Sequence, residues 1–136
     1  MGWEPFKNER ERQHFQEAMV KSTFGDSTDV NNGFDYDLVN KTVERIVELF
    51  SPQKIIIFGS VARREAKAGS DIDILVVMGD DGDKILPSIR IRASLYDIHV
   101  DKDIIVVTPA EFEDEKDDEY SFINEIVNTG YVAYEV

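Results

Sequence analysis

Three short runs rich in β-branched residues constrain the fold of this chain more than any other feature. They are Lys54-Ile-Ile-Ile-Phe58, Asp71-Ile-Asp-Ile-Leu-Val-Val77 and Asp103-Ile-Ile-Val-Val107, and each predicts a strand of a buried sheet. Residues 131–134 (Tyr-Val-Ala-Tyr) are expected to add an edge strand. Helical patterns separate the strands, so we expect a small α/β sandwich in which helices flank the sheet.

Helical periodicity is clearest after Asp35, where apolar residues recur at spacings of three and four and two aspartates favour a helix start. Pro52 is expected to end this helix. Further helices are predicted over residues 7–22, in a short stretch after Ser60, after residue 84, and over 119–129 up to Gly130. The apolar residues of these patterns are Val39, Val43, Ile46, Val47 and Phe50; Val61, Ala62 and Ala66; and Ile85, Ile89 and Leu95.

A chain of 136 residues fits one domain. Residues 25–33 are rich in Gly, Asp, Ser and Asn, which is typical of a loop. We therefore expect residues 1–34 to form an N-terminal helical extension and linker, and residues 35–136 to form the main domain.

Charge and composition exclude several classes of protein. The net charge of −13 repels phosphate backbones, so a general nucleic-acid binder is not expected. The absence of cysteine excludes disulfides, zinc ribbons and thiol catalysis. No apolar run approaches the roughly 20 residues that span a bilayer, and the first residues lack a signal-peptide pattern, so we expect a cytoplasmic protein.

The negative charge is concentrated near the end of the chain. Residues 109–136 carry nine acidic side chains and one basic side chain. Such a stretch forms either a solvated face that keeps the protein soluble or a docking surface for a basic partner.

The stretch most informative about chemistry joins the first two predicted strands. Gly59-Ser60 follows a buried strand and opens a short helix, an arrangement that favours phosphate binding. Ten residues later, Asp71 and Asp73 are spaced so that both carboxylates project from the same face of a strand. Crowded carboxylates need a positive group between them unless the face is solvated, and an all-carboxylate set favours Mg²⁺ or Mn²⁺.

A third carboxylate is expected from the neighbouring strand. Asp103 begins the third predicted strand and directly precedes its apolar run, whereas Asp101 lies two residues earlier and shares its face. We favour Asp103, with Asp101 as the alternative. Three carboxylates beside a phosphate-binding turn describe a two-metal site for nucleotidyl transfer.

This combination resembles the signature of the minimal nucleotidyltransferases of the DNA polymerase β superfamily. The resemblance covers about residues 35–136 and is carried by Phe58-Gly-Ser-Val-Ala-Arg63, Gly69-Ser-Asp-Ile-Asp-Ile-Leu75, Asp103-Ile-Ile-Val-Val-Thr-Pro109 and the closing Glu125-Ile-Val-Asn-Thr-Gly-Tyr-Val-Ala-Tyr134. It implies a mixed sheet of three to four strands with flanking helices.

The resemblance also implies roles for single residues. Gly59, Ser60, Arg63 and Ser70 would contact a nucleoside triphosphate. Asp71, Asp73 and Asp103 would be the catalytic, metal-binding carboxylates, with Mg²⁺ as the metal and Mn²⁺ as an alternative. Arg63 has an ion pair in solvent as its alternative role. Arg90 and Arg92 are expected on the surface, with phosphate contact as the alternative.

Three functions of different classes remain open. The first is a nucleotidyltransferase that moves a nucleoside monophosphate, AMP from ATP, to a hydroxyl on a partner protein. Stand-alone members of the family often act as antitoxins of HEPN-domain toxins, and some adenylylate a toxin tyrosine. The second is a binding module that neutralises such a toxin by contact with little or no catalysis. The third, a structural adaptor, is supported only by the acidic C-terminal stretch.

Overall fold

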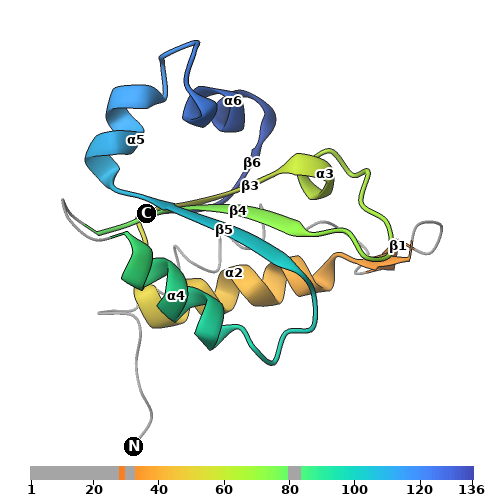
Figure 1. The fold of residues 1–136 in the computed structure, drawn as a ribbon. Helices are drawn as coiled ribbons and strands as arrows, with labels where there is room; N and C mark the ends of the chain where they lie inside the picture. Colours follow the sequence, from red (N-terminus) through yellow and green to blue (C-terminus); the bar gives the residue numbers. More distant parts are fainter. Residues whose placement is uncertain (1–27, 30–32, 80–83) are drawn as a thin grey trace, which may run out of the picture.

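A computed structural model describes residues 28–29, 33–79 and 84–136. Its centre is a mixed four-stranded sheet with the order β5-β4-β3-β6 (Figure 1). The strands are β3 (Lys54–Phe58), β4 (Ile72–Val77), β5 (Lys102–Val107) and β6 (Tyr131–Glu135). The α/β class and the mixed sheet with flanking helices are confirmed, and so is the position of residues 131–134 in an edge strand.

The register of the sheet brings distant parts of the chain together. β3 runs antiparallel to β4 and to β6, while β4 and β5 run parallel. Phe58 lies opposite Asp73 on β4, and Asp73 lies beside Asp103 on β5. The end of β3 and the starts of β4 and β5 therefore meet at one end of the sheet.

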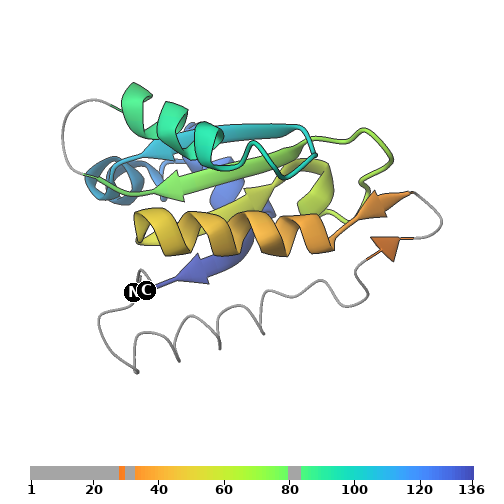
Figure 2. The ribbon, with the colours of Figure 1, turned by 90° about the horizontal axis from the view of Figure 1, so that it is seen from below.

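Helices cover both faces of the sheet, giving three layers (Figures 1 and 2). One face packs against α2 (Asp37–Phe50) and α4 (Ile85–Ser94), and the other against α5 (Pro109–Glu115) and α6 (Phe122–Thr129). The side chains of β4 alternate between two cores: Ile72, Ile74 and Val76 join the α2 and α4 core, whereas Leu75 and Val77 join the α5 and α6 core. Burial of both faces explains why the strands are continuously apolar.

The long helix α2 follows the predicted pattern closely. Asp35 accepts a hydrogen bond from the backbone N–H of Asp37, at 3.0 Å, just before the first turn. At the other end Ser51 adopts a left-handed conformation ahead of Pro52, and its N–H donates to the carbonyl of Val47. Local polar contacts therefore fix both ends of the helix.

Helix α5 is not among the helices predicted from the sequence, which resume after the third strand only at residue 119. Thr108 caps this helix: its hydroxyl accepts a bond from the N–H of Glu111, whose carboxylate accepts one from the N–H of Thr108. Pro109 occupies the first turn, where proline is tolerated. The sequence Thr-Pro-Ala-Glu thus begins a helix.

Other predictions about the elements need correction. Residues 28–29, expected in a loop, form strand β1 (Thr28–Asp29), which pairs with β2 (Phe34–Asp35). Helix α3 (Gly59–Ala62) ends before Ala66, and the last helix begins at Phe122 rather than near residue 119. The predicted helix over 7–22 and most of the 25–33 loop lie outside the described residues.

Of the apolar residues predicted for helix α4, Leu95 is buried, whereas the other two are exposed. Ile85 and Ile89 are 72% and 55% exposed, while Ile91 and the following Leu95 are fully buried against the sheet. Apolar residues occur on two sides of this helix, so their spacing alone does not show which side is buried. Within the described residues, no helix combines the length and the apolar character needed to span a bilayer.

Candidate nucleotidyl-transfer site

The turn from β3 into α3 is built on close contact between Gly59 and Asp73. Gly59 has a φ of +73°, in the left-handed region that glycine adopts without steric cost. A Cβ atom at this position would overlap Oδ2 of Asp73. The glycine therefore lets the backbone after β3 lie directly against the Asp73 carboxylate.

The strand register places Asp103 of β5 directly beside Asp73 of β4. Asp73 and Asp103 are paired positions of the parallel strands β4 and β5, and their side chains share a face with Leu75 and Ile105. Asp71 directly precedes β4 and is exposed. By the alternation of side chains along the strands, Asp73 and Asp103 project on the face that carries α5 and α6. They lie at the end of the sheet from which β3 continues into α3 (Figure 1).

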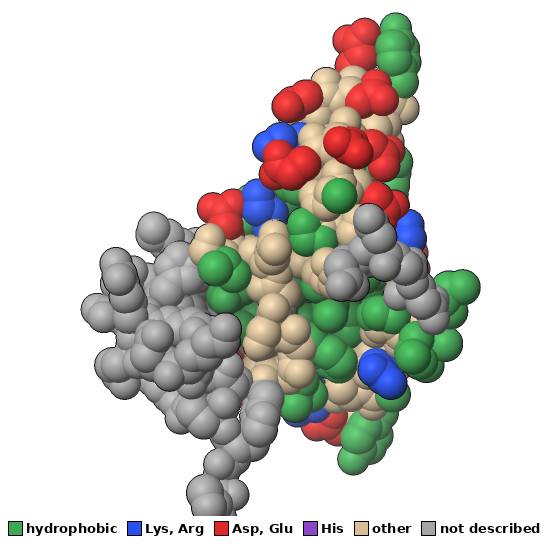
Figure 3. Space-filling view, turned by 90° about the vertical axis from the view of Figure 1, so that its left-hand side faces the viewer, with side chains coloured by type: hydrophobic (Ala, Val, Ile, Leu, Met, Phe, Trp, Pro, Cys, Tyr) green, Lys and Arg blue, Asp and Glu red, His purple; other side chains and the backbone are tan. Residues whose placement is uncertain are grey.

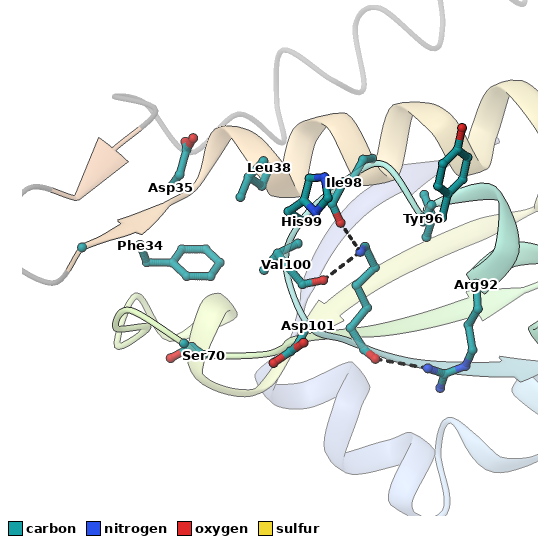
Figure 4. A pocket seen from close by; sticks show the side chains of 14 residues that line it. Phe34, Asp35, Leu38, Ser70, Arg92, Tyr96, Ile98, His99, Val100 and Asp101 are labelled. Atoms are coloured by element: carbon teal, nitrogen blue, oxygen red, sulfur yellow. Dashed lines mark hydrogen bonds between the residues drawn. The ribbon is translucent and has the colours of Figure 1, made fainter.

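Asp101 lies elsewhere. Its carbonyl accepts a bond from the N–H of Ile72 at 2.8 Å, and the residue lines a cavity of about 660 Å³ on the α2 and α4 side of the sheet. Figure 4 shows Asp101 and Ser70 among the side chains that line this cavity. The geometry thus separates Asp101 from the group formed by Asp73 and Asp103.

The pKa of Asp73 is shifted by burial and by the charges around it. Burial raises the pKa of this carboxyl above its ordinary value, the charges of Asp103 and Asp71 raise it further, and Arg63 opposes the shift. Desolvation combined with like charges is typical of functional carboxylates. Asp103, Asp71 and Arg63 are therefore all near enough to Asp73 to act on its charge.

The predicted nucleotide contacts lie in two places. Ser60 follows Gly59 on α3, beside the carboxylates. Arg63 is exposed and forms a 3.1 Å ion pair with Glu65, which is the alternative that the sequence left open. Ser70 closes a turn: its hydroxyl accepts a bond from the N–H of Lys67 at 2.8 Å, and it lines the cavity that contains Asp101.

The carboxylates suit a hard divalent cation chemically, because Mg²⁺ prefers oxygen ligands and carboxylates. Side chains of the described residues do not form a group of three or more carboxylates or imidazoles close enough to hold a metal. The backbone nevertheless brings Asp73 and Asp103 side by side, and Asp71 is close enough to shift the pKa of Asp73. The fit to such an ion is therefore one of donor chemistry and of the neighbouring backbone positions of Asp73 and Asp103.

Arg92 is a residue of this region whose contact the sequence did not predict. Its guanidinium lies 3.7 Å from Oδ1 of Asp103, at the outer edge of β5. The sequence predicted Arg92 on the surface, with phosphate contact as the alternative, and the residue is exposed. No spacing pattern relates it to Asp103.

Comparison with known proteins shows the family to which the chain belongs. The family model "Polymerase beta, Nucleotidyltransferase" matches residues 40–135, and the chain belongs to this family. A search of curated proteins finds no match. The fold is also similar to a solved structure described as a "toxin-antitoxin with AMP-PNP", with a TM-score of 0.50 and 18% identity over 76% of this chain and 75% of the other. A second, the "toxin-antitoxin MntA-HepT", has a TM-score of 0.48 and 18% identity over 75% and 74%.

Proposed function

We propose that the chain is a metal-dependent nucleotidyltransferase that transfers AMP from ATP to a hydroxyl group of a partner protein. The observation that carries this proposal is the register of Asp73 beside Asp103, with Gly59 against the Asp73 carboxylate. These residues meet at one end of the sheet in a chain of the nucleotidyltransferase family.

The chemistry assigns a separate task to each group. Asp71, Asp73 and Asp103 would hold Mg²⁺ or Mn²⁺, which when bound supplies charge stabilisation on the phosphoryl oxygens. Gly59 and Ser60 would seat the triphosphate. Asp103 would also accept the proton of the attacking hydroxyl. A bond forms between the acceptor oxygen and the α-phosphorus, the bond to the β-phosphate bridge breaks, and pyrophosphate leaves.

The charge distribution supports a protein acceptor. Exposed acidic side chains cover α5 and the turn after it, in the upper part of Figure 3, and the residues are Glu113, Asp114, Asp117, Asp118 and Glu119. Lys116, the single basic residue of this stretch, forms an ion pair with Glu113 at 2.7 Å. Such a surface repels nucleic acid and attracts a basic protein.

The class of partner that we propose is a helical HEPN-domain toxin in the cytoplasm. The structure with a TM-score of 0.50 is a toxin–antitoxin complex with a bound ATP analogue, which supports both the nucleotide and this kind of partner. The same likeness favours one second candidate, an antitoxin that neutralises by contact alone. An Asp73→Asn variant that still neutralises its toxin fully would favour this second candidate.

Nucleotide binding is tested by thermal unfolding. Mg²⁺ with ATP is expected to raise the Tm clearly, ATP alone only slightly, and Asp73→Asn is expected to remove the difference, because a ligand stabilises only by binding the native state. A Tm that rises equally with and without Mg²⁺, or equally in the Asp73→Asn variant, would place the nucleotide elsewhere.

A further inference from the structure

Arg92 reaches from α4 to the outer edge of β5. Its guanidinium donates to the backbone carbonyl of Lys102 at 3.2 Å and is 3.5 Å from that of Ile104 (Figure 4 shows the first bond). In the described sheet β5 has β4 on one side and no strand on the other. The arginine thus satisfies carbonyl groups that no neighbouring strand contacts.

These two carbonyls flank Asp103 in sequence, so they fix the guanidinium relative to the Asp103 carboxylate. The remaining contact places the guanidinium 3.7 Å from Oδ1 of Asp103, at the outer edge of the sheet. Arginine suits such a position because its planar fork donates in several directions at once, whereas lysine is a point charge. The carboxylate of Asp73 lies on the opposite side of Asp103, across the β4–β5 pairing.

We propose that Arg92 is the positioning residue of Asp103: it holds this carboxylate at the outer edge of β5 and competes with a divalent cation for it. This inference rests on the proposed function. It explains why Asp73 and Asp103 are adjacent in the backbone while the described side chains form no three-carboxylate group. Without a cation, the pairing with Arg92 limits repulsion between the two carboxylates.

Arg90 provides a matched control on the same helix. It is exposed, carries the same charge, and lies two positions from Arg92. Among the described contacts it forms no bond to β5. Arg90→Gln therefore removes one positive charge near the site without changing the position of Asp103.

The test measures Mn²⁺ affinity of the full-length chain without nucleotide, by electron paramagnetic resonance of the free ion. Arg92→Gln is expected to bind Mn²⁺ more tightly than the parent, by up to about fivefold, which is the range of an exposed ion pair. Arg90→Gln should change the affinity less. Arg92→Lys keeps the positive charge but loses the planar guanidinium, so it should show part of the increase in Mn²⁺ affinity. It serves in place of Arg92→Gln if that variant does not fold.

A double-mutant cycle separates pairing from simple charge. In an Asp103→Asn background, Arg92→Gln should no longer tighten Mn²⁺ binding. Equal gains in Mn²⁺ affinity for Arg92→Gln and Arg90→Gln, or a gain that persists with Asp103→Asn, would overturn the proposed role of Arg92. Neither result would contradict the proposed function. Equal Mn²⁺ binding by the parent and Asp73→Asn would instead overturn the proposed function, and the inference with it.

Discussion

At the scale of single residues, the ionised carboxylate of Asp73 destabilises the folded, metal-free chain, because it is partly buried and lies near other negative charges. Burial and the neighbouring charges of Asp103 and Asp71 raise its pKa above the value near 3.9 of an unfolded aspartate. The folded state therefore binds this proton more tightly than the unfolded state. This tighter proton binding stabilises the folded state. The stabilisation is fully present below the pKa of Asp73 in the unfolded chain and is lost as the pH rises through its pKa in the folded chain.

Asp73→Asn should remove this pH dependence. In EDTA we expect the Tm of the variant to equal that of the parent below about pH 4 and to exceed it at pH 7, as followed by thermal unfolding across this range. Asp114→Asn, an exposed change of the same charge on α5, is the control for the net charge of −13. A variant less stable than the parent at pH 7 would contradict the electrostatic account of Asp73.

Gly59 should be the least replaceable residue of the turn. Gly59→Ala forces a left-handed alanine, at about 1–2 kcal/mol, and also displaces the Asp73 carboxylate. Gly79→Ala introduces the same strain at a φ of +84° with no atom within 4 Å of the new Cβ. Urea unfolding should therefore show a larger loss for Gly59→Ala. Equal losses would mean that Gly59 is needed only for its backbone conformation.

The sequence predicted the positions of these residues better than their contacts. A spacing of two on a strand fixes a shared face, so Asp71 and Asp73 could be associated from the sequence alone. The position of Arg92 beside Asp103 could not, because it depends on β5 being an outer strand and on which side of α4 is buried. Neither property is encoded in local spacing.

At the scale of elements, α5 shows that a threonine and a proline after a strand can also begin a helix. Thr108 is 4% exposed and forms a reciprocal cap with Glu111, and a 2.7 Å ion pair joins Glu111 to Lys84 ahead of α4. A proline after a strand indicates an end, but Thr-Pro-x-Glu also begins a helix. The second interpretation needs the glutamate three residues later to be considered together with the threonine.

Loss of this cap should be measurable. Thr108→Ala is expected to lower the free energy of unfolding by about 1 kcal/mol, with a range of about 0.5–2, as measured by urea unfolding. Thr129→Ala is the control: among the described residues, that exposed hydroxyl donates to the carbonyl of Glu125 within its own helix and makes no other hydrogen bond. Equal effects of the two changes would show that the cap contributes nothing beyond a surface hydroxyl.

Gly130, at the end of α6, was expected as a helix stop, and the structure gives the reason. Its φ is −87°, so no special conformation is required. A Cβ there would instead lie 2.5 Å from the carbonyl oxygen of Ile126 and 2.7 Å from a methyl group of Ile56. The glycine allows α6 and β6 to pack closely on β3, a tertiary constraint that the sequence pattern does not specify.

At the scale of the whole molecule, the sheet order determines which residues can act together. The three apolar runs predicted strands, yet the order β5-β4-β3-β6 arises from pairing between distant segments. That order places the turn after β3 and the starts of β4 and β5 at one end, with the acidic α5 on the same face as the carboxylates. Because α5 follows the far end of β5, the acidic surface lies toward the end of this face opposite the candidate site (Figure 1). A partner attracted to it would have to extend along the face to reach the carboxylates.

The most direct test of nucleotidyl transfer follows the α-phosphate of ATP. The chain is incubated with Mg²⁺ and a lysate of its native host, once with ATP labelled at the α-phosphate and once at the γ-phosphate. We predict that a protein acquires the α-label only, and that Asp73→Asn or EDTA abolishes the labelling by more than about 100-fold, since even partners outside the first shell of a metal contribute 10- to 100-fold. Absence of labelling by the parent, transfer of the γ-label, or undiminished labelling by Asp73→Asn would contradict the account.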